Sequence, residues 1–168
     1  VPYFFSKGYT YIHRIFSLLI FPFFTLLTIH TNKYYCEDIG LRNARIGFRQ
    51  QEMTHIMENI IFNELIIRGW SVDVGIVTST EKNGKGRPSQ VSREIDFIAT
   101  LGGKKVYIQS AYALGTEEKA LAENKPFSPI GDSFPKIIVR YDIRKRWYDE
   151  NGILNIGVID FLLDDRVI

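Results

Sequence analysis

The apolar positions of this chain repeat at intervals that predict both helices and strands. The clearest helix covers residues 52–69, and Gly69 is placed to end it as a C-cap. Its apolar residues recur at three- and four-residue steps, namely Met53, Ile56, Met57, Ile60, Ile61 and Ile67. This spacing indicates a helix with one face packed against a core.

Alternation of apolar and polar residues predicts the strands. In residues 93–111 it continues on both sides of Gly102 and Gly103, which indicates two strands joined by a tight turn. The same signals predict strands at 70–77, 136–142 and 153–156, helices at 116–124 and 158–163, a loop at 78–92, and a short strand, turn and helix within 33–47. This order of elements predicts an α/β fold.

Several carboxylates lie at positions where an ordinary core has none. Asp96 stands between Ile95 and Phe97 in a predicted strand. On a helix with 100° per residue, Glu58 and Glu64 both fall within the apolar arc. Burial of a carboxylate costs several kcal/mol unless it is paired or bound to a cation. These side chains therefore need partners.

One interpretation of the pattern is a metal site formed by Glu58, Asp96 and Gln109. Hard divalent cations take oxygen ligands, and phosphodiester hydrolysis uses such an ion to activate water. A helix carboxylate, a strand carboxylate and a ligand on the neighbouring strand can meet at one point. The alternative is structural: backbone N–H groups or Arg93 satisfy Asp96, and a local cap satisfies Glu58.

Six segments of the chain, in the same order, resemble one family. They are residues 33–43, 58–69, 94–97 (EIDF), 107–110 (YIQS), 134–138 and 152–163. Residues 33–163 thereby resemble the C-terminal domain attached to prokaryotic AAA-type ATPases. That domain is similar to the PD-(D/E)XK nuclease superfamily, and the motif spacing also resembles archaeal Holliday-junction resolvases. The resemblance implies a restriction-endonuclease-like core: a helix, a three-stranded antiparallel meander, a helix and a further strand.

The resemblance also implies roles for the carboxylates. Glu58 matches the helix glutamate and Asp96 the aspartate of the second motif, so that both are candidate Mg²⁺ ligands. Gln109 stands where the third motif has an acid, and Ala111 where it has a lysine. Loss of one such group typically lowers the rate about 10²- to 10³-fold. The expected catalytic site of Glu58, Asp96 and Gln109 is therefore degenerate, unless a displaced lysine takes over, for which the candidates are Lys104, Lys105 and Lys136.

The function implied by the resemblance is a C-terminal nuclease-like module of an AAA-type ATPase that recognises nucleic acid or a protein partner. The alternative is a metal-dependent endonuclease with a displaced lysine. The chain contains no phosphate-binding Gly-x-x-x-x-Gly-Lys-Ser/Thr motif, so ATP would bind only through an upstream ATPase domain.

Basic residues form two groups that could contact phosphates. They are Lys82, Lys85 and Arg87 in the predicted loop and Arg144, Lys145 and Arg146 in a later turn. Trp147 follows the second group and could stack on a base. The net charge of only +2 also fits an ordinary solvated loop and turn.

The chain has 168 residues, enough for one sizeable domain with an appendage. We divide it into a hydrophobic, helical N-terminal segment at 1–32, a linker or end of an upstream region at 33–50, and the nuclease-like domain at 51–168. Residues 15–29 are apolar but shorter than the roughly 20 residues that span a bilayer, and they contain Pro22. We expect a cytoplasmic protein, in keeping with a single cysteine; membrane attachment through 15–29 is the alternative.

Overall fold

A computed structural model describes residues 33–49, 52–82, 86–112, 124–143 and 145–168. Its helices are α1 (Ile39–Arg45), α2 (Met53–Ile67), α4 (Val158–Leu163) and the 3₁₀-helix η1 (Asp165–Val167). Its strands are β1 (Ser71–Lys82), β2 (Pro88–Leu101), β3 (Lys104–Ala111), β4 (Lys136–Arg140), β5 (Trp147–Tyr148) and β6 (Leu154–Gly157).

The strands form one six-stranded sheet in the order β1-β2-β3-β4-β6-β5. β1, β2 and β3 are an antiparallel meander, β4 and β6 run parallel to β3, and β5 is antiparallel to β6. The α/β class predicted from the sequence is confirmed. The predicted helix at 116–124 falls almost entirely outside the described residues, as does the predicted hydrophobic helical segment at 1–32.

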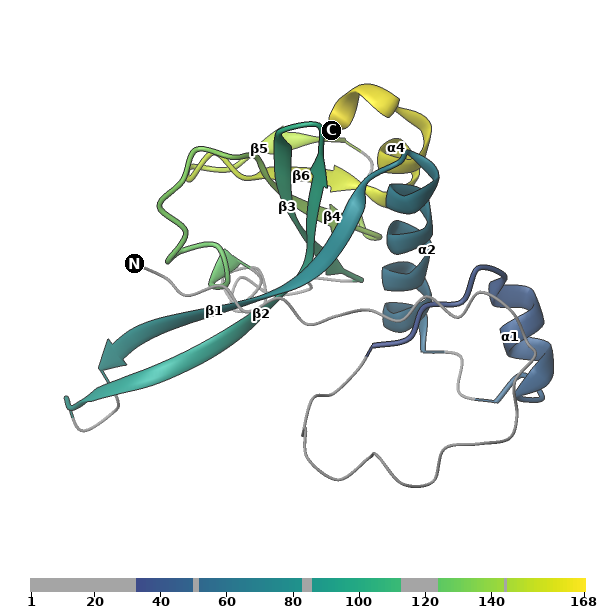
Figure 1. The fold of residues 1–168 in the computed structure, drawn as a ribbon, viewed down its shortest axis with the longest axis horizontal. Coiled ribbons are helices and arrows are strands. Elements are labelled where there is room, and N and C mark those ends of the chain that lie inside the picture. The colour runs from purple at the N-terminus through teal and green to yellow at the C-terminus, as the bar shows by residue number, and fades with distance from the viewer. Residues whose placement is uncertain (1–32, 50–51, 83–85, 113–123, 144) are drawn as a thin grey trace.

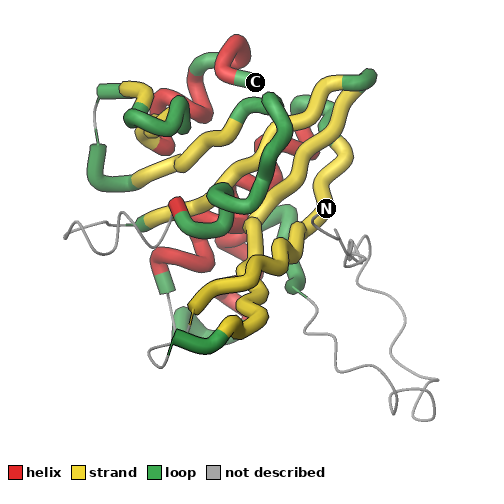
Figure 2. The backbone as a smooth tube through the Cα atoms, turned by 90° about the vertical axis from the view of Figure 1, so that its left-hand side faces the viewer, coloured by secondary structure: helices red, strands yellow, loops and turns green. Residues whose placement is uncertain are grey.

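Both faces of the sheet are covered, which explains why the central strands are apolar on both sides. The first face packs on α2 and α4 (Figure 1), and buried residues such as Phe62, Ile108 and Phe161 form its core. On the second face, Phe127 and Ile130 of the segment before β4 complete a smaller buried cluster. The helices and the segment before β4 thus cover the central strands on opposite faces with two apolar clusters. Figure 2 looks onto the sheet, with a loop in front of the strands and the helices behind them.

The loop predicted at 78–92 is wrong. β1 continues to Lys82 and β2 begins at Pro88, and together they form a two-stranded ribbon that extends well beyond the sheet (Figure 1). Polar cross-strand pairs hold the ribbon: Thr78 pairs with Ser92, and the Arg93 guanidinium donates to Glu81 at 2.8 Å. No helix packs on the ribbon, so its residues can be polar. This polar composition is typical of a loop, which is why the sequence predicted one.

Two smaller expectations also differ from the structure. The short strand predicted at the start of the segment 33–47 is not formed, because residues 33–36 belong to no strand or helix. The two-residue strand β5 was not predicted, because its residues are exposed and carry no alternating pattern.

A β-bulge in β2 sets the direction of Asp96. Asp73 pairs with Ile98 and Gly75 with Ile95, so that Asp96 and Phe97 lie opposite the single residue Val74 of β1. In a regular strand, residues two apart share a face. Here Ile95 belongs to the second-face cluster and Phe97 to the first-face cluster, because the extra residue reverses the alternation. Asp96 therefore faces α2.

An added side chain at Gly75 would collide with Ile98. A Cβ atom there would lie 2.6 Å from Ile98 Cδ1 and 3.5 Å from Ile95 Cβ. We expect Gly75→Ala to lower the free energy of unfolding by about 1–3 kcal/mol through overpacking. Urea denaturation measures this change.

Two variants make the test specific. Gly131→Ala, whose added Cβ meets nothing within 4 Å, should stay within about 1 kcal/mol of wild type. Ile98→Val removes the atom that the new Cβ strikes, so that adding it to Gly75→Ala should restore part of the loss. A Gly75→Ala protein as stable as Gly131→Ala would contradict this account of the bulge.

Candidate functional site

The ammonium group of Lys33 lies among three carboxylates. Its Nζ atom is 2.6 Å from Glu94 Oε1, 2.9 Å from Glu58 Oε1 and 3.4 Å from Asp96 Oδ1. We call these four residues the carboxylate cluster. The side chains of Glu58 and Asp96 are only 14% and 13% exposed, so most of their solvation is replaced by contacts within the protein.

Lys33 is held in place by the segment that follows it. The ring of Tyr35 stacks on Phe62 of α2 with centroids 4.2 Å apart, and its hydroxyl donates to Glu58 Oε1 at 2.6 Å. The backbone N–H of Cys36 donates to Asn59 Oδ1 at 2.9 Å, and the Asn59 amide donates back to the Cys36 carbonyl at 2.8 Å. Residues 33–36 are thus fastened to the helix that carries Glu58.

Asp96 is placed by the bulge and by the end of the β2–β3 ladder. The regular pairing of β2 and β3 stops at Phe97 and Ile108. Beyond it, Asp96 Oδ2 accepts from the backbone N–H of Ser110 at 2.9 Å, and the Asp96 N–H donates to Gln109 Oε1 at 3.4 Å. Where β2 and β3 separate, side-chain oxygens thus accept the backbone N–H hydrogen bonds that the ladder no longer accepts.

Of the three predicted catalytic residues, Glu58 and Asp96 come together through Lys33, and Gln109 faces elsewhere. Tyr107 and Ala111 both belong to the second-face cluster, and Gln109 lies between them in β3 with the same orientation. Its amide oxygen serves the Asp96 backbone instead. Of the structural partners considered for Asp96, a backbone N–H group is confirmed, that of Ser110, whereas Arg93 pairs with Glu81 instead. Glu64, for which no partner was predicted, pairs with Arg68.

Two members of the carboxylate cluster, Lys33 and Glu94, were not identified from the sequence. Glu94 had a signal, because it stands two residues before Asp96 and shares its side of β2. No sequence signal identified Lys33, because no local pattern links it to Asp96, which lies 63 residues further along the chain. The lysines proposed as substitutes lie elsewhere: Lys104 and Lys105 begin β3, whereas the cluster lies near its end.

The cluster perturbs the ionisation of its members. Burial raises the pKa of Asp96, and the neighbouring Glu58 charge raises it further. Lys33 and the Ser110 N–H act in the opposite direction, and the resulting pKa is about 6. For Lys33, burial alone would lower the pKa, but Asp96, Glu94 and Glu58 outweigh it and hold the pKa well above its ordinary value. Lys33 therefore stays charged at neutral pH.

The cluster does not fit the Mg²⁺ ion that the nuclease resemblance implies. Within the described part of the chain, no three His, Cys, Asp or Glu side chains are arranged to hold a metal ion. The three carboxylates are instead joined by Lys33 Nζ, which contacts each of them at 3.4 Å or less. A divalent cation between them would have to displace the ammonium group.

The predicted nucleic-acid contacts are only partly described. Lys85 and Arg144 lie outside the described residues, and only the backbone of Lys82 is described, at the end of β1. Arg87 and Lys145 are exposed. Arg146 is 56% exposed but pairs with Asp164 at 3.1 Å, so part of its charge is neutralised.

The apolar segment 15–29, the basis of the membrane alternative, lies outside the described residues. Among the helices that are described, none has the length and apolar character needed to cross a membrane.

Comparison with known proteins shows a similarity to a bacterial protein. Over 134 residues the chain is 34% identical to an uncharacterised protein of Haemophilus influenzae. The alignment covers 78% of this chain and 28% of that protein, so the chain spans little more than a quarter of the relative's length. No family model and no solved structure matches the chain.

We predict that the charges of the cluster control the pKa of Asp96. In wild type, ¹³C NMR of the Asp96 carboxyl group should give a midpoint of about 6. Lys33→Met should raise this pKa, because a stabilising positive charge is lost, and Glu58→Gln should lower it, because a repelling negative charge is lost.

The same shift predicts a pH dependence of stability. The folded pKa of about 6 exceeds the ordinary 3.8, so the native state binds more protons between these values. The contribution of Asp96 to the unfolding free energy should therefore fall as pH rises from about 4 to 6, relative to Asp96→Asn. An Asp96 midpoint near 4, or one that ignores Lys33→Met, would contradict the contacts described.

Proposed function

We propose that this chain is a nuclease-like module that binds nucleic acid without cleaving it, with the Lys33 ammonium group as the cation of its carboxylate cluster. The observation that carries the proposal is the contact of Lys33 Nζ with Glu58, Glu94 and Asp96. An ammonium group can neutralise carboxylates, but it cannot act as a Lewis acid or bind and activate water as a metal ion does.

The arrangement of elements supports a restriction-endonuclease-like interpretation of the fold. A helix carrying Glu58 packs on a three-stranded antiparallel meander, Asp96 lies on the middle strand, and a parallel strand follows β3. These elements follow the order that the family resemblance implies, apart from the second helix, expected at 116–124, which lies almost entirely outside the described residues. Two features of β3 support the non-cleaving interpretation: Gln109 and Ala111 stand where the motif has an acid and a lysine, and neither side chain faces the carboxylate cluster.

The β1–β2 ribbon is the part best shaped to contact nucleic acid. It extends beyond the sheet (Figure 1), and its outer end carries Lys82 and Arg87. A two-stranded ribbon fits the major groove of a duplex, and cationic side chains at its end would contact phosphates. Lys145, exposed beside β5, is a second contact of the same kind.

We further propose that the module works within a longer protein, as the C-terminal part of a cytoplasmic AAA-type ATPase. Two observations support this: the six sequence segments that resemble such domains, and a relative of which the alignment covers only 28%. ATP would then bind outside this chain, and a protein partner would be the alternative to nucleic acid.

A second candidate function is a metal-dependent endonuclease in which Lys33 is the displaced lysine. One observation favours it: Lys33 Nζ is 3.4 Å from Asp96 Oδ1, although it comes from a different segment than the superfamily's lysine. This function requires Lys33 to release the carboxylates so that a metal ion can enter.

A cleavage assay separates the two functions. The full chain is incubated with Mg²⁺ or Mn²⁺ and with labelled single-stranded, duplex and branched DNA, beside Asp96→Asn. We expect no cleavage above the Asp96→Asn background in any combination. Cleavage by wild type that disappears in Asp96→Asn would sink the non-cleaving proposal in favour of the endonuclease.

Binding is measured with the same DNAs by fluorescence anisotropy, with EDTA present. We expect binding that weakens with salt and falls at least severalfold in the Lys82→Ala/Arg87→Ala variant, because two phosphate contacts are lost. Arg45→Ala/Arg49→Ala removes the same charge from the α1 region and should have a smaller effect. Equal losses in both pairs, or no binding at low salt, would remove the support for nucleic acid as the partner.

A further inference from the structure

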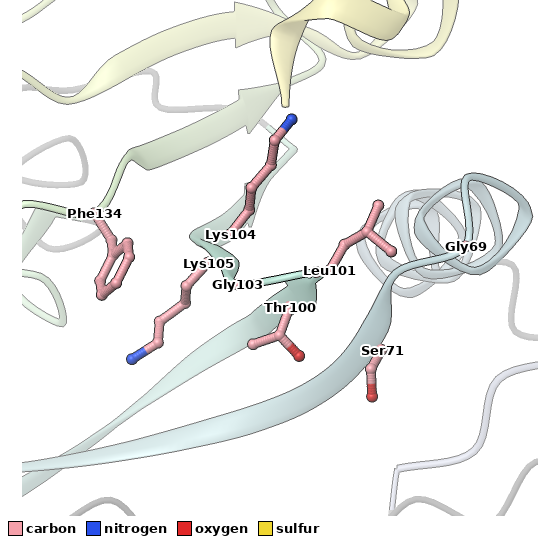
Figure 3. Close-up of a pocket in the computed structure, with 9 residues that line it drawn as sticks. Gly69, Ser71, Thr100, Leu101, Gly103, Lys104, Lys105 and Phe134 are labelled. Carbon is pink, nitrogen blue, oxygen red and sulfur yellow. The ribbon is translucent and has the colours of Figure 1, made fainter.

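A second polar site lies at the other end of the β2–β3 hairpin from the carboxylate cluster. There an open pocket of about 550 Å³ is lined by Ser71, Thr100, Gly102, Gly103, Lys105 and Phe134, among others (Figure 3). Because it adjoins the Gly102–Gly103 turn, it is separated from Asp96 by most of the length of β3.

Three polar side chains form a row across the strands of this pocket. Ser71 pairs with Thr100, and Thr100 pairs with Lys105, so that the row crosses β1, β2 and β3. Thr100 follows Ile98 by two positions and Lys105 precedes Tyr107 by two, which places both on the second face of the sheet. Figure 3 shows Lys104 pointing away from this row.

Aromatic rings support the ammonium group of Lys105. Its Nζ atom lies 4.8 Å from the Phe134 ring centroid and 3.5 Å from the Tyr107 hydroxyl. The Tyr107 hydroxyl donates in turn to Asp132 Oδ2 at 2.6 Å, and Asp132 also lies 3.9 Å from Lys136 Nζ. No carboxylate is among the residues that line the pocket, and Lys105 supplies a positive charge on this side of the strand.

The turn leaves the backbone accessible beside this row. Gly102 and Gly103 have φ values of +53° and +87°, which favour glycine, and an added Cβ would meet nothing within 4 Å at either position. A ligand can therefore approach the turn closely.

We propose that this pocket binds a phosphate group, with Lys105 supplying charge and the Ser71 and Thr100 hydroxyls supplying hydrogen bonds. An ammonium group and two hydroxyls on one side of a pocket without carboxylates match the acceptor oxygens of a phosphate. The phosphate belongs either to a small molecule, such as a nucleotide, or to the end of a nucleic-acid strand.

The test is NMR titration of the full chain with inorganic phosphate, with AMP, and with a short oligonucleotide with or without a 5′-phosphate. We expect shifts of the Ser71, Thr100 and Lys105 amides. In Lys105→Met, which keeps the stem beside Phe134, the affinity should fall about tenfold or more, since a charged hydrogen bond is lost. Thr100→Val should weaken binding by a smaller factor.

Lys104→Met is the matched control. Lys104 also lines the pocket and carries the same charge, but its side chain points to the opposite side of the strand. This variant should change the affinity no more than about threefold, as expected of an exposed charge. Equal losses in Lys104→Met and Lys105→Met, or no shifts at tens of millimolar phosphate, would overturn the proposal. Tighter binding of the 5′-phosphorylated oligonucleotide would identify the end of a strand as the ligand. Binding of AMP as tight as that of this oligonucleotide would identify a small molecule. Either result supports a phosphate site.

This proposal does not depend on the carboxylate cluster. Phosphate binding could fail while the cluster behaves as described, and DNA binding through the ribbon could fail while the pocket binds phosphate. The amide shifts distinguish these outcomes, because the ribbon and the pocket involve different residues.

Discussion

The ammonium group of Lys33 offsets the repulsion among three carboxylates that the fold brings together. Glu58 comes from α2, and Glu94 and Asp96 come from one side of β2, so all three would repel one another without a cation between them. Removing one partner of such a poorly solvated group leaves charge uncompensated, which is far more costly than losing a surface ion pair. The attachment of residues 33–36 to α2 is best understood as the means by which the lysine stays there.

The backbone does as much as the charges to form this site. One extra residue in β2 turns Asp96 toward α2, and Gly75 leaves space for the isoleucines on either side of the bulge. The same irregularity marks where the β1–β2 ribbon departs from the sheet. The carboxylate cluster therefore lies at the base of the ribbon that we propose contacts nucleic acid, where β2 stops pairing with β3.

Much of the fold could be predicted from local patterns. Helix α2, the turn at Gly102 and Gly103, and strands β4 and β6 follow from periodicity and glycine placement, which act over a few residues. The ribbon could not be recognised, since its strands bury little and have a polar composition. The bulge depends on register between two strands, and single-strand periodicity carries no information about it.

Only part of the candidate site could be predicted from the sequence. Glu58 and Asp96 stood out because carboxylates are rare in apolar patterns, and the structure brings them together. Gln109 was included for its place in a motif, yet strand alternation turns it to the other face. Lys33 could not be found, because its role depends on the packing of Tyr35 on Phe62 and on a contact across much of the chain.

The most direct test of this account is whether the carboxylate cluster accepts a metal ion. Paramagnetic Mn²⁺ broadens the NMR signals of nuclei near its binding site, so it reports on Glu58, Glu94 and Asp96 directly. With Lys33 as the resident cation, we expect no selective broadening of these residues in wild type at millimolar Mn²⁺, and broadening in Lys33→Met. Selective broadening of Glu58 and Asp96 in wild type would contradict it, because it would show that a metal ion displaces the lysine.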